Sequence, residues 1–150
     1  IKKNCNFAVV MARLLAIDYG LRRTGLAVTD PSKIIVSPLQ TVDTTHLTPF
    51  LKEYLVKEKV EKIIVGYPEN PQKDMVNPIV KQIILFTDNL KKLFPDIPLV
   101  FYNEEYTSKE AVSVMLAGGF GRKFRQTKGN TDRMAAALIL QGWIDENDAN

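Results

Sequence analysis

Cysteine and long apolar runs are what this 150-residue sequence has least of. Its single cysteine, Cys5, excludes an intramolecular disulfide and a zinc site built from several thiolates, and it is typical of a reduced compartment. No stretch approaches the roughly 18 apolar residues that a membrane span needs. Basic residues precede an early apolar patch, but Arg13 interrupts that patch and no cleavage-like site follows. We therefore expect a cytoplasmic protein without a secretory signal or a membrane partner.

The composition is that of one globular domain. Hydrophobic residues make up 45% of the chain and charged residues 25%, and the length suits a single core. We expect residues 1–10 to be an N-terminal extension, residues 11–145 to be the domain and residues 146–150 to be a tail. The formal net charge of +3 permits a polyanionic partner without requiring one.

The order of apolar patterns predicts an α/β protein with a mixed sheet. Three strands come first, at Leu14–Ile17, Thr24–Thr29 and Lys33–Pro38, and their short connections predict an antiparallel meander. Helical and strand-like spacing then alternate. The expected helices are His46–Lys59, Val80–Leu90, Thr107–Ala117 and Thr131–Trp143, and the expected later strands are Lys62–Gly66 and Leu99–Tyr102. Strands separated by helices imply right-handed parallel crossovers, so we expect helices on both faces of the sheet.

Three acids occupy positions that could form one site. Asp18 ends the first strand, Glu104 follows the last one, and Asp132 opens the final helix. Ligand sites of open α/β sheets lie outside strand ends, which makes Asp18 and Glu104 candidates for a shared cleft. Asp132 leads a helical stripe with Ala135 and Ala136, whose small side chains would allow close approach to the sheet. Each acid alone also has an ordinary explanation, as a turn residue, a solvated strand end or a favourable charge at a helix start.

If these carboxylates converge, they require a cation. Three close negative charges would repel one another unless a bound ion neutralised them. Carboxylate oxygens favour Mg²⁺ or Mn²⁺ over zinc, and the only histidine, His46, stands apart from the acids. The pattern therefore predicts a magnesium or manganese site.

Basic residues crowd two loops beside the acids. Arg22 and Arg23 follow Asp18 closely, and a glycine-rich loop without acids precedes Asp132. The cations of that second loop are Arg122, Lys123, Arg125 and Lys128. Any one of them could be a solvated surface charge, but as a set they suit binding to a phosphate backbone. We therefore expect nucleic acid as the partner.

Four stretches, in order, resemble the motifs of a known nuclease family. They are AIDYGLRRTGLAVTD, KIIVGYPEN, NEEYTSKEA and KGNTDRMAAALIL. Together they resemble the YqgF-type (RuvX) nucleases over nearly all of residues 11–143. The resemblance implies a ribonuclease H-like fold, with a mixed five-stranded sheet flanked by helices.

The same resemblance implies roles for the three acids. Asp18, Glu104 and Asp132 would be catalytic residues that hold one or two Mg²⁺ or Mn²⁺ ions for phosphodiester hydrolysis. The third motif usually reads Asp-Glu-Arg in this family, whereas this chain has Asn103, Glu104 and Glu105. Glu105 therefore replaces an arginine and is a further candidate for the metal-binding role.

The family resemblance leaves more than one function open. We expect a metal-dependent nuclease that processes the 5′ end of pre-16S rRNA, with ribosomal particles as a further partner. The alternatives are a Holliday junction resolvase acting on four-way DNA junctions and a non-catalytic nucleic-acid-binding protein. Symmetric resolution of a junction calls for a two-fold dimer, and no dimerisation stripe is evident, so RNA processing is favoured. An actin-like ATPase is disfavoured because this length cannot supply its two lobes.

Overall fold

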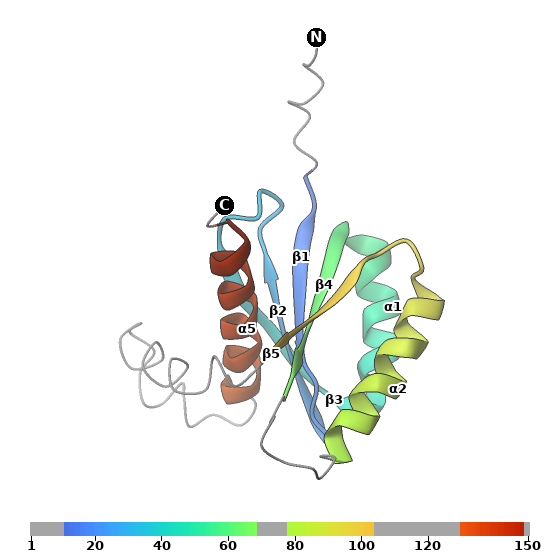
Figure 1. Cartoon of the computed structure of the whole chain (residues 1–150). Coiled ribbons are helices and arrows are strands. Elements are labelled where there is room, and N and C mark those ends of the chain that lie inside the picture. The colour runs from blue at the N-terminus through green and yellow to red at the C-terminus, as the bar shows by residue number, and fades with distance from the viewer. Residues whose placement is uncertain (1–10, 69–77, 104–129, 149–150) are drawn as a thin grey trace.

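A five-stranded mixed sheet organises the chain (Figure 1). The computed structural model describes residues 11–68, 78–103 and 130–148, with the side chains of the last helix described for 133–147. The strand order is β3-β2-β1-β4-β5. The strands are β1 (Arg13–Asp18), β2 (Arg23–Thr29), β3 (Val36–Asp43), β4 (Val60–Tyr67) and β5 (Leu99–Asn103). The first three pair antiparallel, whereas β4 runs parallel to β1 and β5 runs parallel to β4. The predicted α/β fold with a mixed five-stranded sheet is confirmed.

Helices cover both faces of this sheet. A 3-10 turn, η2 (Thr44–His46), leads into α1 (Leu47–Lys57), and α2 (Pro78–Leu93) follows β4. Figure 1 shows α1 and α2 together on one side of the sheet and α5 (Asn130–Asp148) on the other. Within the described ranges, no helix combines the length and apolar character needed to cross a membrane.

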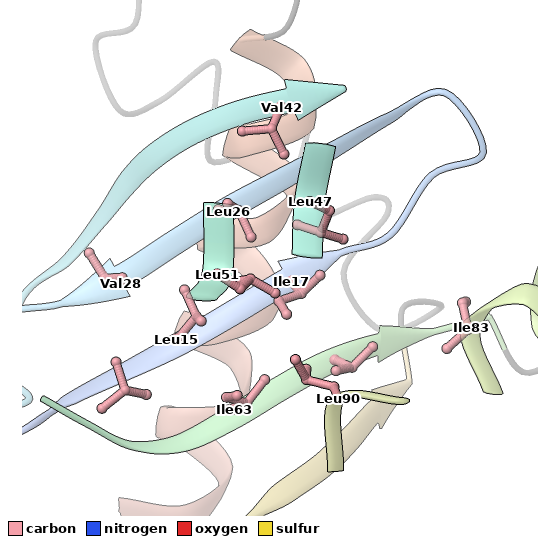
Figure 2. Packing of buried hydrophobic residues seen from close by; sticks show 12 residues of the cluster. Leu15, Ile17, Leu26, Val28, Val42, Leu47, Leu51, Ile63, Ile83 and Leu90 are labelled. Atoms are coloured by element: carbon pink, nitrogen blue, oxygen red, sulfur yellow. The ribbon is translucent and has the colours of Figure 1, made fainter. Parts of the chain in front are cut away.

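Alternation along β1 divides the core into two layers. Leu15 and Ile17 point toward α1 and α2, where they pack with residues such as Leu47 and Leu51 (Figure 2). The intervening residues, Leu14 and Ala16, pack on the α5 side. Successive side chains of a strand point to opposite faces, so this pattern explains why the central strand is apolar throughout. It also assigns the next position, Asp18, to the face that α5 covers.

Small residues let α5 lie close to the sheet. Ala136 is fully buried and Ala137 nearly so, in the same layer as Ile139 and Leu140. Gly142 meets Tyr102 of β5 so closely that a Cβ at position 142 would lie 2.6 Å from the tyrosine hydroxyl oxygen. The expected close approach of the last helix to the sheet is therefore observed.

The third strand was predicted too early in the chain. It begins at Val36 rather than at Lys33 and continues to Asp43. The carboxylate of Asp30 explains the difference, because its Oδ1 accepts the backbone N–H of Ile34 at 2.8 Å and of Ile35 at 2.7 Å. These hydrogen bonds, that of Ile35 first, hold the pKa of Asp30 below its ordinary value. Lys33 adopts a left-handed φ of 63° in the same turn, so these residues cannot extend as a strand.

Other element boundaries differ by a few residues. The first helix proper begins at Leu47, after the 3-10 turn, and the final helix continues to Asp148 rather than ending near Trp143. The expected helix at residues 107–117 lies outside the described residues.

Candidate active site

Asp18 is the last residue of β1 and is half-buried on the α5 face. Its partner on β2 is Gly25. On the other side, Ile17 pairs with Val65 of β4, so the next residue along, Gly66, is the neighbour of Asp18. Laterally paired residues project to the same face, and here both neighbours lack a side chain. The carboxylate therefore lies between two glycine backbones rather than between bulky side chains.

Two further elements reach this end of the sheet. Figure 1 shows α5 running opposite to β1, so the helix begins toward the edge where β1 and β4 finish. Asp132 is the third residue of α5, in its first turn, as expected. Glu104 immediately follows Asn103, the last residue of β5.

The structure describes part of the region in which the acidic site is predicted. It brings Asp18 and the first turn of α5 to the same face, and β5 ends beside β4. Glu104 and the side chain of Asp132 lie outside what the structure describes, as does Glu105. Among the described side chains, no group of three or more His, Cys, Asp and Glu residues could hold a metal ion. Since only one of the predicted ligands belongs to that set, the triad stays a prediction.

The β1–β2 loop, which follows Asp18, presents two cations. Arg22 is exposed in the loop, and Arg23 is exposed at the first position of β2. Asp43 of β3 is the register partner of Arg23, which places an acid opposite that arginine. The other predicted contacts, Arg122, Lys123, Arg125 and Lys128, lie outside the described residues. Of the described cations, Arg22 is therefore the better candidate for phosphate.

Glycine at position 20 allows the tight path of this loop. A Cβ there would overlap the carbonyl oxygen of Arg23, although the backbone of Gly20 is not left-handed. No local sequence pattern indicates a role for Gly20. None indicates Thr24 and Thr44 either, whose hydroxyl groups hold the loop, because Thr44 is 24 residues away from its partner, Gly20.

At the same end of the sheet, aromatic residues pack on the opposite face, the one that α1 and α2 cover. Tyr19 follows Asp18 and packs against Phe86 of α2, with ring centroids 5.1 Å apart. Burial raises the pKa of the Tyr19 phenol. Tyr67, at the end of β4, makes an edge-on contact with Phe101 at 5.5 Å. These contacts support the strand ends on the face that α1 and α2 cover, opposite the face to which Asp18 belongs.

A mixed sheet of this order, with a C-terminal helix packed on one face, defines the ribonuclease H-like fold. Thermus thermophilus RuvC, solved in complex with a Holliday junction substrate, has the same fold, with a TM-score of 0.58 at 17% identity. The alignment covers 91% of this chain and 96% of RuvC. A second T. thermophilus RuvC structure gives a TM-score of 0.52 at 15% identity, over the same shares of the two chains.

The particular family follows from sequence. The RuvX family, described as Holliday junction resolvase, matches residues 12–146, and the chain belongs to it. A relative from Amoebophilus asiaticus, named as a candidate pre-16S rRNA nuclease, is 46% identical over 134 residues, covering 89% of this chain and 94% of the relative. A relative of the same name from Phocaeicola vulgatus is 44% identical over 135 residues, covering 90% and 96%. The resemblance found in the four sequence motifs is confirmed.

Proposed function

We propose that this chain is a divalent-metal-dependent nuclease that hydrolyses phosphodiester bonds at the 5′ end of pre-16S rRNA, in the cytoplasm, during ribosome biogenesis. The observation that carries the proposal is the position of Asp18, half-buried at the end of the central strand and on the face that α5 covers. The names of the relatives at 44–46% identity support the choice of substrate.

The donor set fits a hard cation. Asp18 offers carboxylate oxygens from the rigid centre of the sheet, and the glycines beside it, Gly25 and Gly66, add no competing side chain. We propose that Glu104 and Asp132 complete the set, one from the end of β5 and one from the start of α5. When bound, Mg²⁺ or Mn²⁺ would supply a Lewis acid and lower the pKa of an attacking water. The role of Asp18 is then to fix the position of that chemistry relative to the sheet.

Cationic groups would hold the substrate. Arg22 is exposed three residues after Tyr19, and the proposed second set is Arg122, Lys123, Arg125 and Lys128. Guanidinium and ammonium groups bind phosphate oxygens without reading sequence, so affinity should fall with rising salt. Recognition of one RNA site would then depend on the shape of the precursor.

A four-way DNA junction is the second candidate substrate, because the matching family is described as Holliday junction resolvase. Symmetric cleavage of a junction needs two copies of the site related by a two-fold axis. A pre-rRNA end has no such symmetry. The two substrates therefore make different demands on oligomeric state.

Parallel cleavage assays test the proposed function. The wild-type protein is incubated with Mg²⁺ or Mn²⁺ and a 5′ pre-16S rRNA fragment, a synthetic four-way junction or an unrelated single-stranded RNA. Asp18→Asn should abolish cleavage of the rRNA fragment. The matched control is Asp88→Asn, since Asp88 is exposed on α2, across the sheet from Asp18, and its replacement should leave cleavage intact.

The other outcomes separate the alternatives. Cleavage of the junction alone would identify a resolvase, and tight binding without cleavage would identify a non-catalytic binding protein. If the folded wild-type protein neither binds nor cleaves any of the three substrates, the nuclease proposal is wrong.

A further inference from the structure

A single residue outside the β1–β2 loop holds two of its carbonyl groups. Thr44, the first residue of η2, donates its backbone N–H to the carbonyl oxygen of Arg22 at 2.9 Å. Its hydroxyl donates to the carbonyl oxygen of Gly20 at 2.6 Å. The loop that carries Arg22 is thus attached at two points to the segment that follows β3.

A second threonine closes this arrangement. Thr24, fully buried in β2, has its hydroxyl oxygen 2.9 Å from that of Thr44. A hydroxyl group has one proton to donate, and Thr44 gives its proton to Gly20. Thr24 must therefore be the donor to Thr44, which leaves the Thr24 oxygen to accept the N–H of Gly20, at 3.5 Å.

The hydrogen bonds form a closed ring. It runs from the N–H of Gly20 to the hydroxyl of Thr24, on to the hydroxyl of Thr44, and back to the carbonyl oxygen of Gly20. All donors point the same way around the ring, an arrangement in which each bond polarises the next. Two side chains thereby satisfy both polar groups of a residue that lies two positions after Asp18.

We propose that Thr44 is a positioning residue that fixes Arg22 for phosphate binding beside Asp18. The proposal deepens the proposed nuclease function and rests on it. A loop whose backbone is already ordered loses less conformational entropy when its side chain binds a ligand. Arg22 is the residue concerned because the Thr44 N–H holds the carbonyl group of Arg22 and the Thr44 hydroxyl holds that of Gly20, two residues earlier in the same loop; Arg23 instead has Asp43 as its register partner. Removing the hydroxyl therefore releases the loop at Gly20 and leaves the attachment at Arg22 as the remaining one of the two.

Three variants separate this role from general stability. Thr44→Val keeps the shape and the backbone N–H but removes the hydroxyl, and Thr44→Ser keeps the hydroxyl. Thr87→Val is the control for loss of a threonine hydroxyl elsewhere, because the hydroxyl of Thr87, a buried residue of α2, donates to the carbonyl oxygen of Ile84 in its own helix, at 3.0 Å. If Thr44→Val does not fold, as judged by circular dichroism, Thr44→Ala removes the same hydroxyl with less bulk.

The first measurement is equilibrium binding of the 5′ pre-16S rRNA fragment in EDTA, over a range of salt concentrations. Thr44→Val should weaken binding about 3- to 10-fold, which corresponds to the net contribution of roughly one hydrogen bond. It should lower the slope of log Kd against log salt by about 0.7, the value of roughly one phosphate contact on a single strand. Thr44→Ser should restore both, and Thr87→Val should change neither.

A double-mutant cycle shows whether Thr44 acts through Arg22. In an Arg22→Ala background, Thr44→Val should have no further effect on Kd, because the group that it positions is gone. In the cleavage assay, Thr44→Val alone should raise KM and leave kcat nearly unchanged. An equal and additive loss in both backgrounds would overturn the proposal.

Amide hydrogen exchange gives a readout that does not depend on RNA. Residues 20–24 should exchange faster in Thr44→Val than in the wild type. Faster exchange with unchanged RNA binding would refute the positioning role while leaving the nuclease function intact. A wild-type protein that neither binds nor cleaves RNA would instead refute the nuclease function, and the positioning role with it.

Discussion

Replacing Gly20 by alanine should destabilise the protein, although alanine usually stabilises at such a position. Gly20 has no left-handed φ, so its backbone conformation is open to any residue. Alanine would then gain about 0.4–1 kcal/mol by restricting the unfolded chain. The obstacle is steric, because the new Cβ would overlap the carbonyl oxygen of Arg23 and the backbone there would have to move.

The cost can be worked from the hydrogen bonds that such a movement breaks. The loop has three hydrogen bonds to the two threonines, one from the N–H of Gly20 and one each to the carbonyl oxygens of Gly20 and Arg22. At about 0.5–1.5 kcal/mol each, their loss amounts to roughly 1.5–4.5 kcal/mol. Subtracting the gain in the unfolded state leaves a net loss of about 0.5–4 kcal/mol in the free energy of unfolding.

Urea denaturation followed by far-ultraviolet circular dichroism measures this difference. The m-value should stay the same, so that the midpoint alone moves to lower urea. In a Thr44→Val background the cost of Gly20→Ala should be smaller, because part of the ring is already lost. A Gly20→Ala protein as stable as the wild type, or more stable, would refute the reasoning, since the ordinary entropic gain would then be the only effect.

Three further variants test the turn, the core and the helix contact. Asp30→Ala should be less stable than the wild type above pH 3.8, the ordinary pKa of an aspartate such as Asp30. The difference should shrink as the pH falls through the lowered pKa that Asp30 has in the folded protein. Unfolding curves from pH 7 to pH 2 measure this, and a difference that stays constant would contradict it. Ile139→Ala, at 1% exposure, should cost about 2–5 kcal/mol, whereas Val56→Ala, at 84% exposure, should cost little in the same urea assay; equal costs would argue against the α5 core layer. Gly142→Ala should lower the melting temperature, and Tyr102→Phe should relieve part of that loss by removing the atom nearest the new Cβ; additive losses would contradict the assigned contact.

Local pattern predicted most of the fold. The apolar run at Leu14–Ile17 lies within β1, and Lys62–Gly66 lies within β4, because a strand covered on both faces is apolar at every position. The strand predicted at Lys33–Pro38 began too early for a physical reason. Its β-branched residues favour a strand, but the carboxylate of Asp30 accepts the amides that a strand would need.

The sequence predicts less of the site than of the fold. The place of Asp18 followed from the end of an apolar run, and the start of the last helix was found within one residue. Thr44 gave no such signal, since a threonine before a helix usually suggests a cap. Its actual partner, Gly20, is brought near only by the pairing of β2 with β3, which is a tertiary effect that no local pattern reports.

The alternation of side chains along β1 sets both the orientation of the candidate catalytic residue, Asp18, and the packing of the hydrophobic core. The hydrogen-bonded register that sends Leu15 and Ile17 toward α1 and α2 also sends Asp18 toward α5. Deleting one residue within β1 would exchange the faces of the residues that follow the deletion, so that Asp18 would take the position of Ile17 and point toward α1 and α2, and Tyr19 would take the position of Asp18. Insertions and deletions in this strand should therefore be far less tolerated than single substitutions. The same alternation of side chains fixes both the core residues and the face of the proposed catalytic carboxylate.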